Sequence, residues 1–262
     1  MRIDGAVVRC PAAAPDLADA PHAGVLCRAG PRGFLFDVPR VARYLVSEGN
    51  LVDIEPCAGA DDLQVRRFLR TTPAVALYLQ RGMPVLHAAV AVSPAGDAVV
   101  LAGDSGAGKS VLLTALLQRG WGLLTDDLAP LTLGRNRVPV AVPTWPEVRL
   151  WPGCAMRAVY PESGLDDVFI GEPRPVKAIW WLGVHGFDPI EIKSVEGLSR
   201  FEALGAMAYN GRIASALLDR SGYLAVAGAV ADSGIPILRL IRPRGRWTAG
   251  QLADLIGDGA TG

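Results

Sequence analysis

The sequence predicts an α/β fold with a small β-rich module at its N-terminus, and three observations lead to this prediction. In residues 1–60, short apolar runs alternate with glycines and other turn-forming residues, which is typical of strands. Between residues 85 and 125 the pattern becomes strand, glycine-rich loop, helix and strand, the core order of an α/β fold. Half of the 262 residues are hydrophobic, so the chain can bury a sizeable core. We therefore expect the module at 1–60 and a helical lead-in with the core at 61–262.

Strands and one helix are expected in the module. Apolar runs bounded by turn residues predict strands at Gly24–Cys27, Gly33–Phe36 and Leu51–Glu55. The spacing of apolar residues over Val41–Val46 favours a short amphipathic helix, which Gly49 would end.

The lead-in is expected to be helical. Asp61 is a good N-cap, and apolar residues recur at helical spacing from residue 62 to residue 80. Pro73 interrupts this stretch, because proline lacks a backbone N–H and clashes with the preceding turn. The sequence therefore predicts two consecutive helices.

The core is expected to begin with two strands joined by a turn, followed by a glycine-rich loop, a helix and a further strand. The first elements are strands at Val85–Val92 and Ala98–Ala102, a helix at Lys109–Gln118 and a strand ending at Thr125. Later strands are predicted at Leu131–Leu133, Val138–Val142, Val176–Val184 and Pro236–Ile241. Later helices are predicted at Leu198–Ala208, Ile213–Leu218, Tyr223–Ala231 and Ala249–Ile256.

Charge and hydropathy exclude two classes of partner. Lysine plus arginine equals aspartate plus glutamate at 26 each, and no basic block is present, so nucleic acid is not an expected partner. No apolar run approaches the roughly 18–20 residues of a membrane-spanning helix, and the first residues lack the layout of a signal peptide. We expect a cytoplasmic protein with no membrane partner, and the sequence leaves homo-oligomerisation open.

One motif indicates a binding function. Gly103, Asp104, Ser105, Gly106, Ala107, Gly108, Lys109 and Ser110 match G-x-x-x-x-G-K-[ST] without a mismatch. An apolar strand precedes the motif and an apolar helix follows it, which is the setting in which such a loop binds phosphate. Glycines let successive backbone N–H groups point at phosphate oxygens, and the helix N-terminus adds partial positive charge. Lys109 would contact the β- and γ-phosphates, and the Ser110 hydroxyl would help to hold Mg²⁺.

Two adjacent acids follow the next strand. Asp126 and Asp127 come directly after Thr125, at a strand end where ligand-binding residues of α/β folds gather. One carboxylate could complete a Mg²⁺ shell while the other accepts a proton from an attacking hydroxyl; an ordinary solvated turn is the alternative. His87 lies in an apolar strand, where a lone histidine is more often a core residue than a functional one.

These residues resemble a known family. Pro84–Ala88, Val100–Ser110 and Gln118–Asp127 are similar to the HPr kinase/phosphorylase superfamily, in which a histidine precedes the phosphate loop and paired aspartates follow it. The resemblance covers about residues 84–130 and is closer to the shorter HPr-kinase-like relatives that are often found in lasso peptide (ribosomal peptide) biosynthesis. It implies a P-loop core of the HPr-kinase type.

The resemblance also implies an activity. It implies an ATP- and Mg²⁺-dependent kinase that phosphorylates a serine hydroxyl on a peptide or small protein, a lasso-type precursor peptide being the leading acceptor. Asp127 would be the general base, Asp126 the metal-side carboxylate and His87 a neighbour that positions the reacting groups, with the two aspartate roles exchangeable. Val111 stands where family enzymes that act on HPr carry an acidic residue, so HPr is the secondary acceptor.

Several alternatives stay open at this stage. An NTP-hydrolysing switch is one, although the N-K-x-D tetrad of GTPases is absent from the sequence. A nucleotide-gated peptide-binding module without phosphate transfer is another. Arg149, Arg212 and Arg242 are candidates for a clamp on the transferred phosphate, and Trp180-Trp181 is more typical of core than of an adenine platform.

Overall fold

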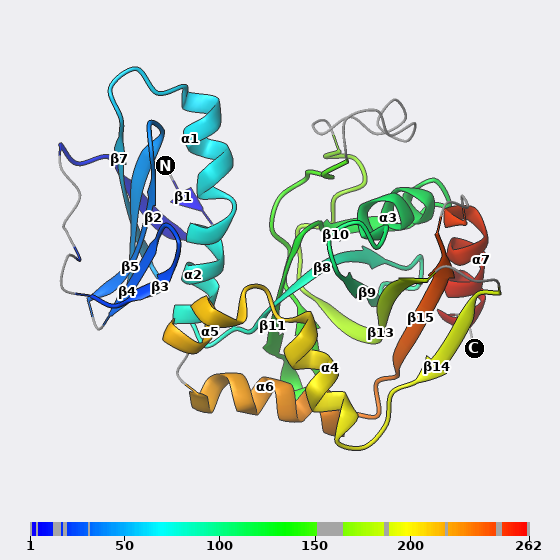
Figure 1. Cartoon of the computed structure of the whole chain (residues 1–262). Coiled ribbons are helices and arrows are strands. Elements are labelled where there is room, and N and C mark those ends of the chain that lie inside the picture. The colour runs from blue at the N-terminus through cyan, green and yellow to red at the C-terminus, as the bar shows by residue number, and fades with distance from the viewer. Residues whose placement is uncertain are drawn as a thin grey trace. The chain divides into compact units, whose positions relative to one another are not determined.

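The computed structural model describes residues 2–3, 5–12, 17, 20–30, 32–150, 165–185, 189–217, 220–244 and 248–260. The chain forms two compact units, Met1–Val85 with Tyr209–Leu224 and Leu86–Ala208 with Ala225–Gly262. It is a mixed α/β protein with an N-terminal β-sheet and a larger mixed sheet (Figure 1). Within the described residues, none of the helices has both the length and the apolar character needed to cross a membrane.

A seven-stranded sheet forms the first unit. Its strands are β1 (Arg2–Ile3), β2 (Ala6–Arg9), β3 (His22–Gly24), β4 (Cys27–Gly30), β5 (Gly33–Val38), β6 (Ala42–Ser47) and β7 (Leu51–Pro56). They are ordered β1-β2-β7-β6-β5-β4-β3, and only β2 and β7 pair in parallel. A bidentate ion pair joins these two strands, because Arg9 donates to the buried Asp53 at 2.6 and 2.7 Å.

Two predictions for this sheet are wrong. The segment expected to be a helix at Val41–Val46 is strand β6, which pairs antiparallel with both β5 and β7. Its flanking residues Arg40 and Glu48 have positive φ, so tight turns form on both sides and draw the segment into the sheet. The strand expected at Gly24–Cys27 is a turn between β3 and β4, and Val25 at its tip is 98% exposed.

Three helices lie in this first unit. They are α1 (Asp62–Leu69), α2 (Thr72–Gln80) and α5 (Gly211–Leu217). Helix α5 corresponds to the helix expected at Ile213–Leu218, of which residue 218 lies outside the described residues. Asp61 caps α1 by accepting from the backbone N–H of Leu63, and Pro73 lies in the first turn of α2, so the expected division into two helices is confirmed. The buried Tyr44 of β6 donates to the carbonyl of Val65 on α1 at 2.9 Å.

The compact units differ from the segments expected from the sequence. Helices α1 and α2 group with the N-terminal sheet, whereas the predicted boundary at residue 60 placed them with the core. The apolar side of α2 explains this grouping, because the helix contacts β5 and β6. The division into 1–60 and 61–262 as folding domains stays a prediction.

An eight-stranded mixed sheet forms the second unit. Its strands are β8 (Val85–Val92), β9 (Ala98–Gly103), β10 (Gly122–Thr125), β11 (Leu128–Leu133), β12 (Pro139–Ala141), β13 (Arg174–His185), β14 (Glu191–Ser194) and β15 (Ile237–Pro243). The path β10-β8-β11-β12-β13-β15-β14 is completed by β9, which pairs antiparallel with β8 and parallel with β13. The pairings β8–β11–β12–β13–β9–β8 therefore close on themselves.

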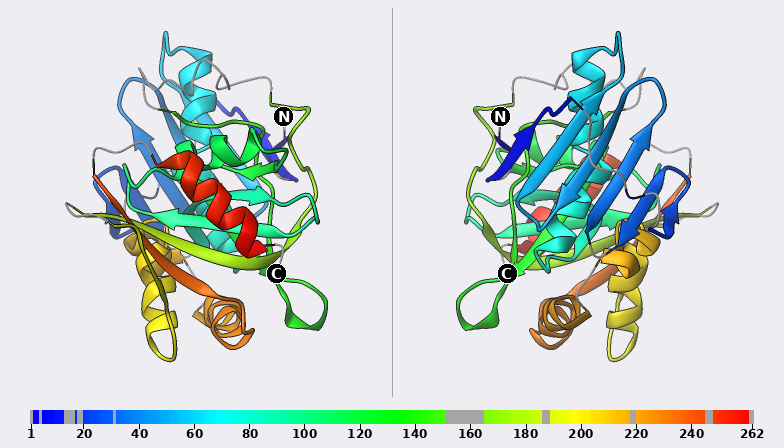
Figure 2. Two further views of the ribbon diagram at one scale, coloured as in Figure 1. Left: turned by 90° about the vertical axis from the view of Figure 1, so that its right-hand side faces the viewer. Right: turned by 90° about the vertical axis from the view of Figure 1, so that its left-hand side faces the viewer.

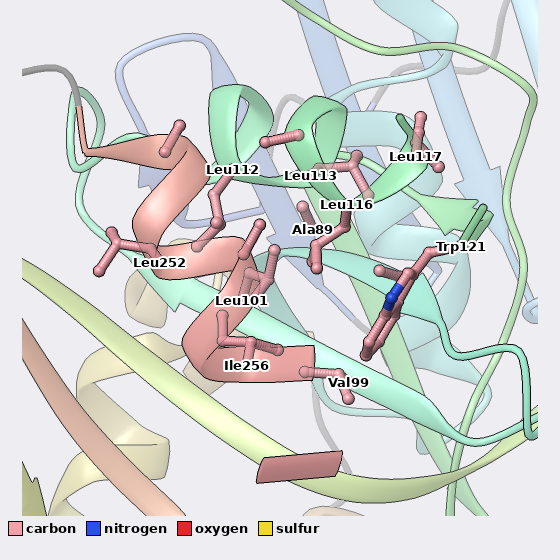
Figure 3. Packing of buried hydrophobic residues seen from close by; sticks show 14 of the residues in the cluster. Ala89, Val99, Leu101, Leu112, Leu113, Leu116, Leu117, Trp121, Leu252 and Ile256 are labelled. Atoms are coloured by element: carbon pink, nitrogen blue, oxygen red, sulfur yellow. The ribbon is translucent and has the colours of Figure 1, made fainter. Parts of the chain in front are cut away.

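Two helices cover one face of this sheet. They are α3 (Lys109–Leu117) and α7 (Ala249–Ala260), seen in green and red in Figure 2. Figure 3 shows their leucines and Ile256 packed on Val99 and Leu101 of β9, with Ala89 of β8 beside them. Trp180 and Leu182 of β13 belong to the same buried cluster. The remaining helices are α4 (Ser199–Met207) and α6 (Arg220–Asp232), the latter running across the division between the units.

Candidate functional site

The glycine-rich loop joins β9 to α3 and depends on glycine at two positions. Gly103 has φ +146°, and a Cβ there would lie 2.6 Å from the carbonyl oxygen of Leu182. Gly108 precedes α3 in a left-handed conformation, with φ +102°. The loop can therefore lie directly against β13 and turn sharply into the helix. This is the strand–loop–helix setting that the motif requires.

Lys109 is buried and uses three donors within the site. Its side chain is 7% exposed, and Nζ lies 2.7 Å from the carbonyl of Gly103, 3.1 Å from the carbonyl of Asp104 and 3.0 Å from Nε2 of His87. Burial lowers the pKa of Lys109, and the negative charges of Asp127, Asp126 and Asp104 offset part of that effect. The ammonium group is thus held at the start of the loop.

His87 connects Lys109 to Asp127. It lies near the start of β8, with Nε2 toward Lys109 and Nδ1 3.1 Å from Oδ1 of Asp127. An ammonium group has donors only, so Nε2 accepts its hydrogen bond. The proton of the imidazole then resides on Nδ1 and faces the carboxylate. The histidine is therefore part of the site rather than of the apolar core.

Asp126 is a fully engaged, buried acid. Oδ1 accepts from the hydroxyl of Ser110 at 3.0 Å, and Oδ2 accepts from the backbone N–H of Arg149 at 2.7 Å. Burial raises the pKa of Asp126 to about 6, although both hydrogen bonds and the charge of Arg149 act in the opposite direction. A nearby cation would stabilise the charged form of this group.

Asp127 faces different partners from its neighbour. The chain turns at this residue with φ +76°, a conformation that aspartate tolerates better than most residues. Oδ2 accepts from Nη1 of Arg149 at 2.9 Å, while Oδ1 faces His87. Burial alone would raise the pKa of Asp127, but the hydrogen bond from His87 and the charges of Arg149 and Lys109 outweigh it and lower the pKa. Asp127 is a charged, half-buried carboxylate, the state required of a proton acceptor.

The three candidate arginines have different surroundings. Arg149 contacts both acids, through its backbone for Asp126 and its side chain for Asp127. Arg242, near the end of β15, donates through Nε to the carbonyl of Ala107 at 3.1 Å and so touches the loop. Arg212 lies on α5 in the other unit.

The residues near Ser110 fit Mg²⁺ by their chemistry. Neighbouring oxygens in an octahedral Mg²⁺ shell lie about 2.9 Å apart, and the Ser110 hydroxyl is 3.0 Å from Oδ1 of Asp126. In the described part of the chain, no group of three or more His, Cys, Asp or Glu side chains could hold a metal. Such sparse protein ligation is typical of Mg²⁺, which keeps water molecules and takes substrate phosphates as ligands.

The structure brings most of the predicted site residues together. Gly103–Ser110 form the loop, with Ala107 buried and Asp104, Ser105 and Gly106 exposed. Hydrogen bonds and the contact between His87 and Asp127 form one continuous chain, which connects Lys109, His87, Asp127, Arg149, Asp126 and Ser110. The contact of Arg149 with both acids was not predicted, because 22 residues separate it from Asp127 and no local pattern signals such a pairing.

Comparisons with known proteins reach only part of the chain. No protein-family model matches it. The small ribosomal subunit biogenesis GTPase RsgA of Opitutus terrae is 37% identical over 112 residues, which are 39% of this chain and 29% of that GTPase. The match thus spans less than a third of the curated relative. The HPr(Ser) kinase/phosphatase of Coxiella burnetii aligns with a TM-score of 0.39 and 16% identity, over 68% of this chain and 90% of that chain.

Proposed function

We propose that this protein is an ATP-dependent phosphotransferase that moves the γ-phosphoryl group to a serine hydroxyl on a peptide or small protein. The single observation that carries the proposal is the position of Asp127. Its carboxylate is held between His87 and Arg149, in a chain of contacts that leads to the ammonium group of the phosphate loop. A charged carboxylate held in this way can accept the proton of an attacking serine hydroxyl during transfer.

In the transfer step, Asp127 accepts the proton of the attacking serine. The serine oxygen forms a bond to the γ-phosphorus while the bond between that phosphorus and the β–γ bridging oxygen breaks. The nucleoside diphosphate then leaves with that oxygen. His87 and Arg149 orient the carboxylate and keep it charged, as the lowered pKa of Asp127 indicates. Catalysis of this kind rests mainly on positioning and charge stabilisation, so few residues suffice.

Lys109 and the loop supply positive charge where the transferred group carries negative charge. The backbone N–H groups of the loop and the N-terminus of α3 bind phosphate oxygens. Lys109 leaves its contacts with the carbonyls of Gly103 and Asp104 to reach the β- and γ-phosphates. Ser110 and Asp126 would hold a Mg²⁺ ion, whose chemistry there would be to neutralise part of the phosphate charge.

The acceptor is proposed from the family resemblance of the sequence. The short HPr-kinase-like relatives suggest a lasso-type precursor peptide, and HPr is the second choice because Val111 replaces the acidic residue of enzymes that act on HPr.

Transfer of a labelled γ-phosphate tests the function. The protein is incubated with Mg²⁺ and γ-labelled ATP together with a peptide ending in serine, with HPr, or with no acceptor. We expect label on the serine peptide, loss of labelling in Lys109→Ala, and retained nucleotide binding without transfer in Asp127→Asn. Asp232→Asn, which alters an exposed acid at the end of α6, serves as the matched control. Normal transfer by Asp127→Asn would show that the base is assigned wrongly.

A nucleotide-hydrolysing switch is the second candidate, and the partial identity with a GTPase favours it. The sequence lacks the N-K-x-D tetrad that reads guanine in GTPases, which weighs against it. Release of inorganic phosphate from GTP in preference to ATP, without any acceptor, would support this candidate over the kinase.

A further inference from the structure

A half-buried arginine lies on an aromatic ring beside the phosphate loop, and the mechanism described above does not use it. Arg239, in the middle of β15, places its guanidinium carbon 3.9 Å from the centre of the Trp181 ring. A planar guanidinium stacked on tryptophan keeps its N–H donors at the rim of the stack, free to bind an anion in the same plane. Trp181 is therefore not simply core, unlike its buried neighbour Trp180.

Gly183 creates the space that Arg239 occupies. A Cβ at Gly183 would lie 2.8 Å from Nη2 of Arg239, 3.2 Å from its guanidinium carbon and 3.5 Å from Nε. All three of the nearest atoms belong to that one arginine, so the glycine accommodates the guanidinium specifically. The guanidinium of Arg239 therefore stacks on the Trp181 ring and also packs closely against the backbone of Gly183.

The strand register places this guanidinium at the start of the phosphate loop. Arg239 is paired in register with Trp181 on the neighbouring strand β13. Its side chain extends along β13 as far as Gly183, two residues after Trp181. Leu182, between these two residues, is level with Gly103, the first residue of the loop. The charge of the next loop residue, Asp104, acts on Arg239. Since Trp180 and Leu182 face α3 and α7, Arg239 lies on the opposite face of the sheet.

Arg239 differs from the other two arginines of the site in having its donors uncommitted. Arg149 donates to Asp127, and Arg242 donates to the carbonyls of Ala107 and Pro243. In the part of the chain that the structure describes, Arg239 forms no hydrogen bond and no ion pair; its contact is the stack on Trp181. A partly buried guanidinium with free donors next to a phosphate-binding loop is matched chemically by a phosphate group.

We propose that Arg239, stacked on Trp181 and seated against Gly183, binds the terminal phosphate of the nucleoside triphosphate. The inference rests on the proposed function and adds a clamp that sequence analysis did not name. Lys109 reaches the phosphates from the loop side, and Arg239 reaches the terminal phosphate from the other face of the sheet. Nucleoside diphosphates lack the group that Arg239 contacts, so the arginine discriminates between substrate and product.

Differential nucleotide binding tests the inference. Calorimetric titrations of the full chain with Mg²⁺ and either ADP or the non-hydrolysable imido analogue of ATP are compared for wild type and Arg239→Met, which keeps an apolar side chain on Trp181. We expect ADP affinity within about twofold of wild type and a loss of about tenfold or more for the imido analogue, as for one charge-assisted hydrogen bond. The rate of transfer should fall roughly 10³-fold, the lower range for removing a phosphate-clamping arginine. Arg174→Met, which removes a partly exposed arginine paired with Glu172, is the matched control.

A double-mutant cycle that combines Gly183→Ala with Arg239→Met distinguishes an effect on the position of the guanidinium from a general effect on the fold. Gly183→Ala moves the guanidinium without removing it. This variant should selectively weaken binding of the imido analogue, as Arg239→Met does. In the double variant the methyl group has no arginine to displace, so its effect should equal that of Arg239→Met alone. Fully additive effects would show that Gly183 acts through the fold and not through Arg239, and would overturn the placement.

The outcomes distinguish this inference from the proposed function. Equal losses for ADP and the imido analogue, or none for either, would overturn the terminal-phosphate contact while leaving the kinase proposal intact. A change confined to the KM of the peptide would assign Arg239 to the acceptor and also overturn it. Failure of the wild type to bind either nucleotide would overturn both proposals.

Discussion

Arg149 donates a hydrogen bond from Nη1 to Oδ2 of Asp127 at 2.9 Å. Its backbone N–H simultaneously donates to Asp126, so one residue fixes both members of the acid pair. The two contacts differ in what a substitution can remove, because the backbone bond persists whatever the side chain is. This separation makes the roles of the two acids experimentally distinguishable.

Replacing Arg149 with methionine should therefore affect Asp127 selectively. Loss of the guanidinium raises the pKa of Asp127, so the acid limb of the pH–rate profile should move to higher pH by roughly one unit. The plateau rate should fall about tenfold because the base is less well oriented. Arg149→Lys, which keeps the charge but not the fork, should show a smaller shift. An unchanged acid limb with full activity would contradict a positioning role for Arg149.

The second prediction concerns the tautomer of His87. In nucleotide-free protein, ¹⁵N spectra should show the proton of His87 on Nδ1, because Lys109 donates to Nε2. The chain has three histidines, and comparison with the His87→Asn variant identifies the signal. A proton on Nε2 would contradict the direction of the Lys109 contact.

A pair of His87 variants separates its two contacts. The amide nitrogen of His87→Asn can replace Nδ1 and donate to Asp127, whereas the amide of His87→Gln can replace only Nε2 toward Lys109. We expect the asparagine variant to retain at least about tenfold more phosphate transfer than the glutamine variant. The reverse order would place the importance of His87 in its contact with Lys109.

The third prediction concerns the stability of the metal-free protein. Burial raises the pKa of Asp126 to about 6 in the folded state, so the unfolded chain loses its proton at lower pH than the folded one. The contribution of Asp126 to the free energy of unfolding is present in full below the ordinary aspartate pKa, near 4, and is lost as pH rises through about 6. Over that range the free energy of unfolding falls by at most about 1.4 kcal/mol per pH unit.

Asp126→Asn should remove that slope. In EDTA, the difference in free energy of unfolding between variant and wild type, measured by urea denaturation from pH 4 to pH 7, should increase with pH in favour of the variant. The same variant should lose Mg²⁺-dependent nucleotide binding. A difference that is flat with pH would show that Asp126 titrates normally.

The fourth prediction compares two loop glycines. Gly103→Ala should destabilise the fold by about 2–4 kcal/mol, because the new Cβ would lie 2.6 Å from a backbone carbonyl that cannot move independently of β13. Gly106→Ala meets open space, so only its positive φ opposes the change, at about 1–2 kcal/mol. Thermal denaturation measures both variants, and equal losses would contradict the close packing of Gly103.

Local patterns predicted much of the site's layout, while long-range pairing determined the rest. The loop and the acid pair are contiguous motifs, and the strand–loop–helix order places them at one end of a sheet. His87 could be connected to them only through a family resemblance, because one histidine in an apolar strand has no distinctive pattern. Their assigned chemical roles stay predictions.

Arg149 and Arg239 could not be predicted in their observed contacts. Each depends on the register of segments far apart in the chain, such as the level pairing of Arg239 with Trp181. The helix expected at Val41–Val46 is strand β6 for a related reason. Six residues with mixed apolar spacing suit either structure, and pairing with β5 and β7 decides between them.

The ring of pairings through β8, β11, β12, β13 and β9 has a consequence for how the site can respond to a ligand. Sliding one of these strands past its neighbour would break hydrogen bonds on both of its sides at once, so the backbone near His87 and Gly103 behaves as a rigid frame. We therefore expect adjustment to an incoming nucleotide to involve side-chain rotation and the loop itself, with Lys109 exchanging carbonyl oxygens for phosphate.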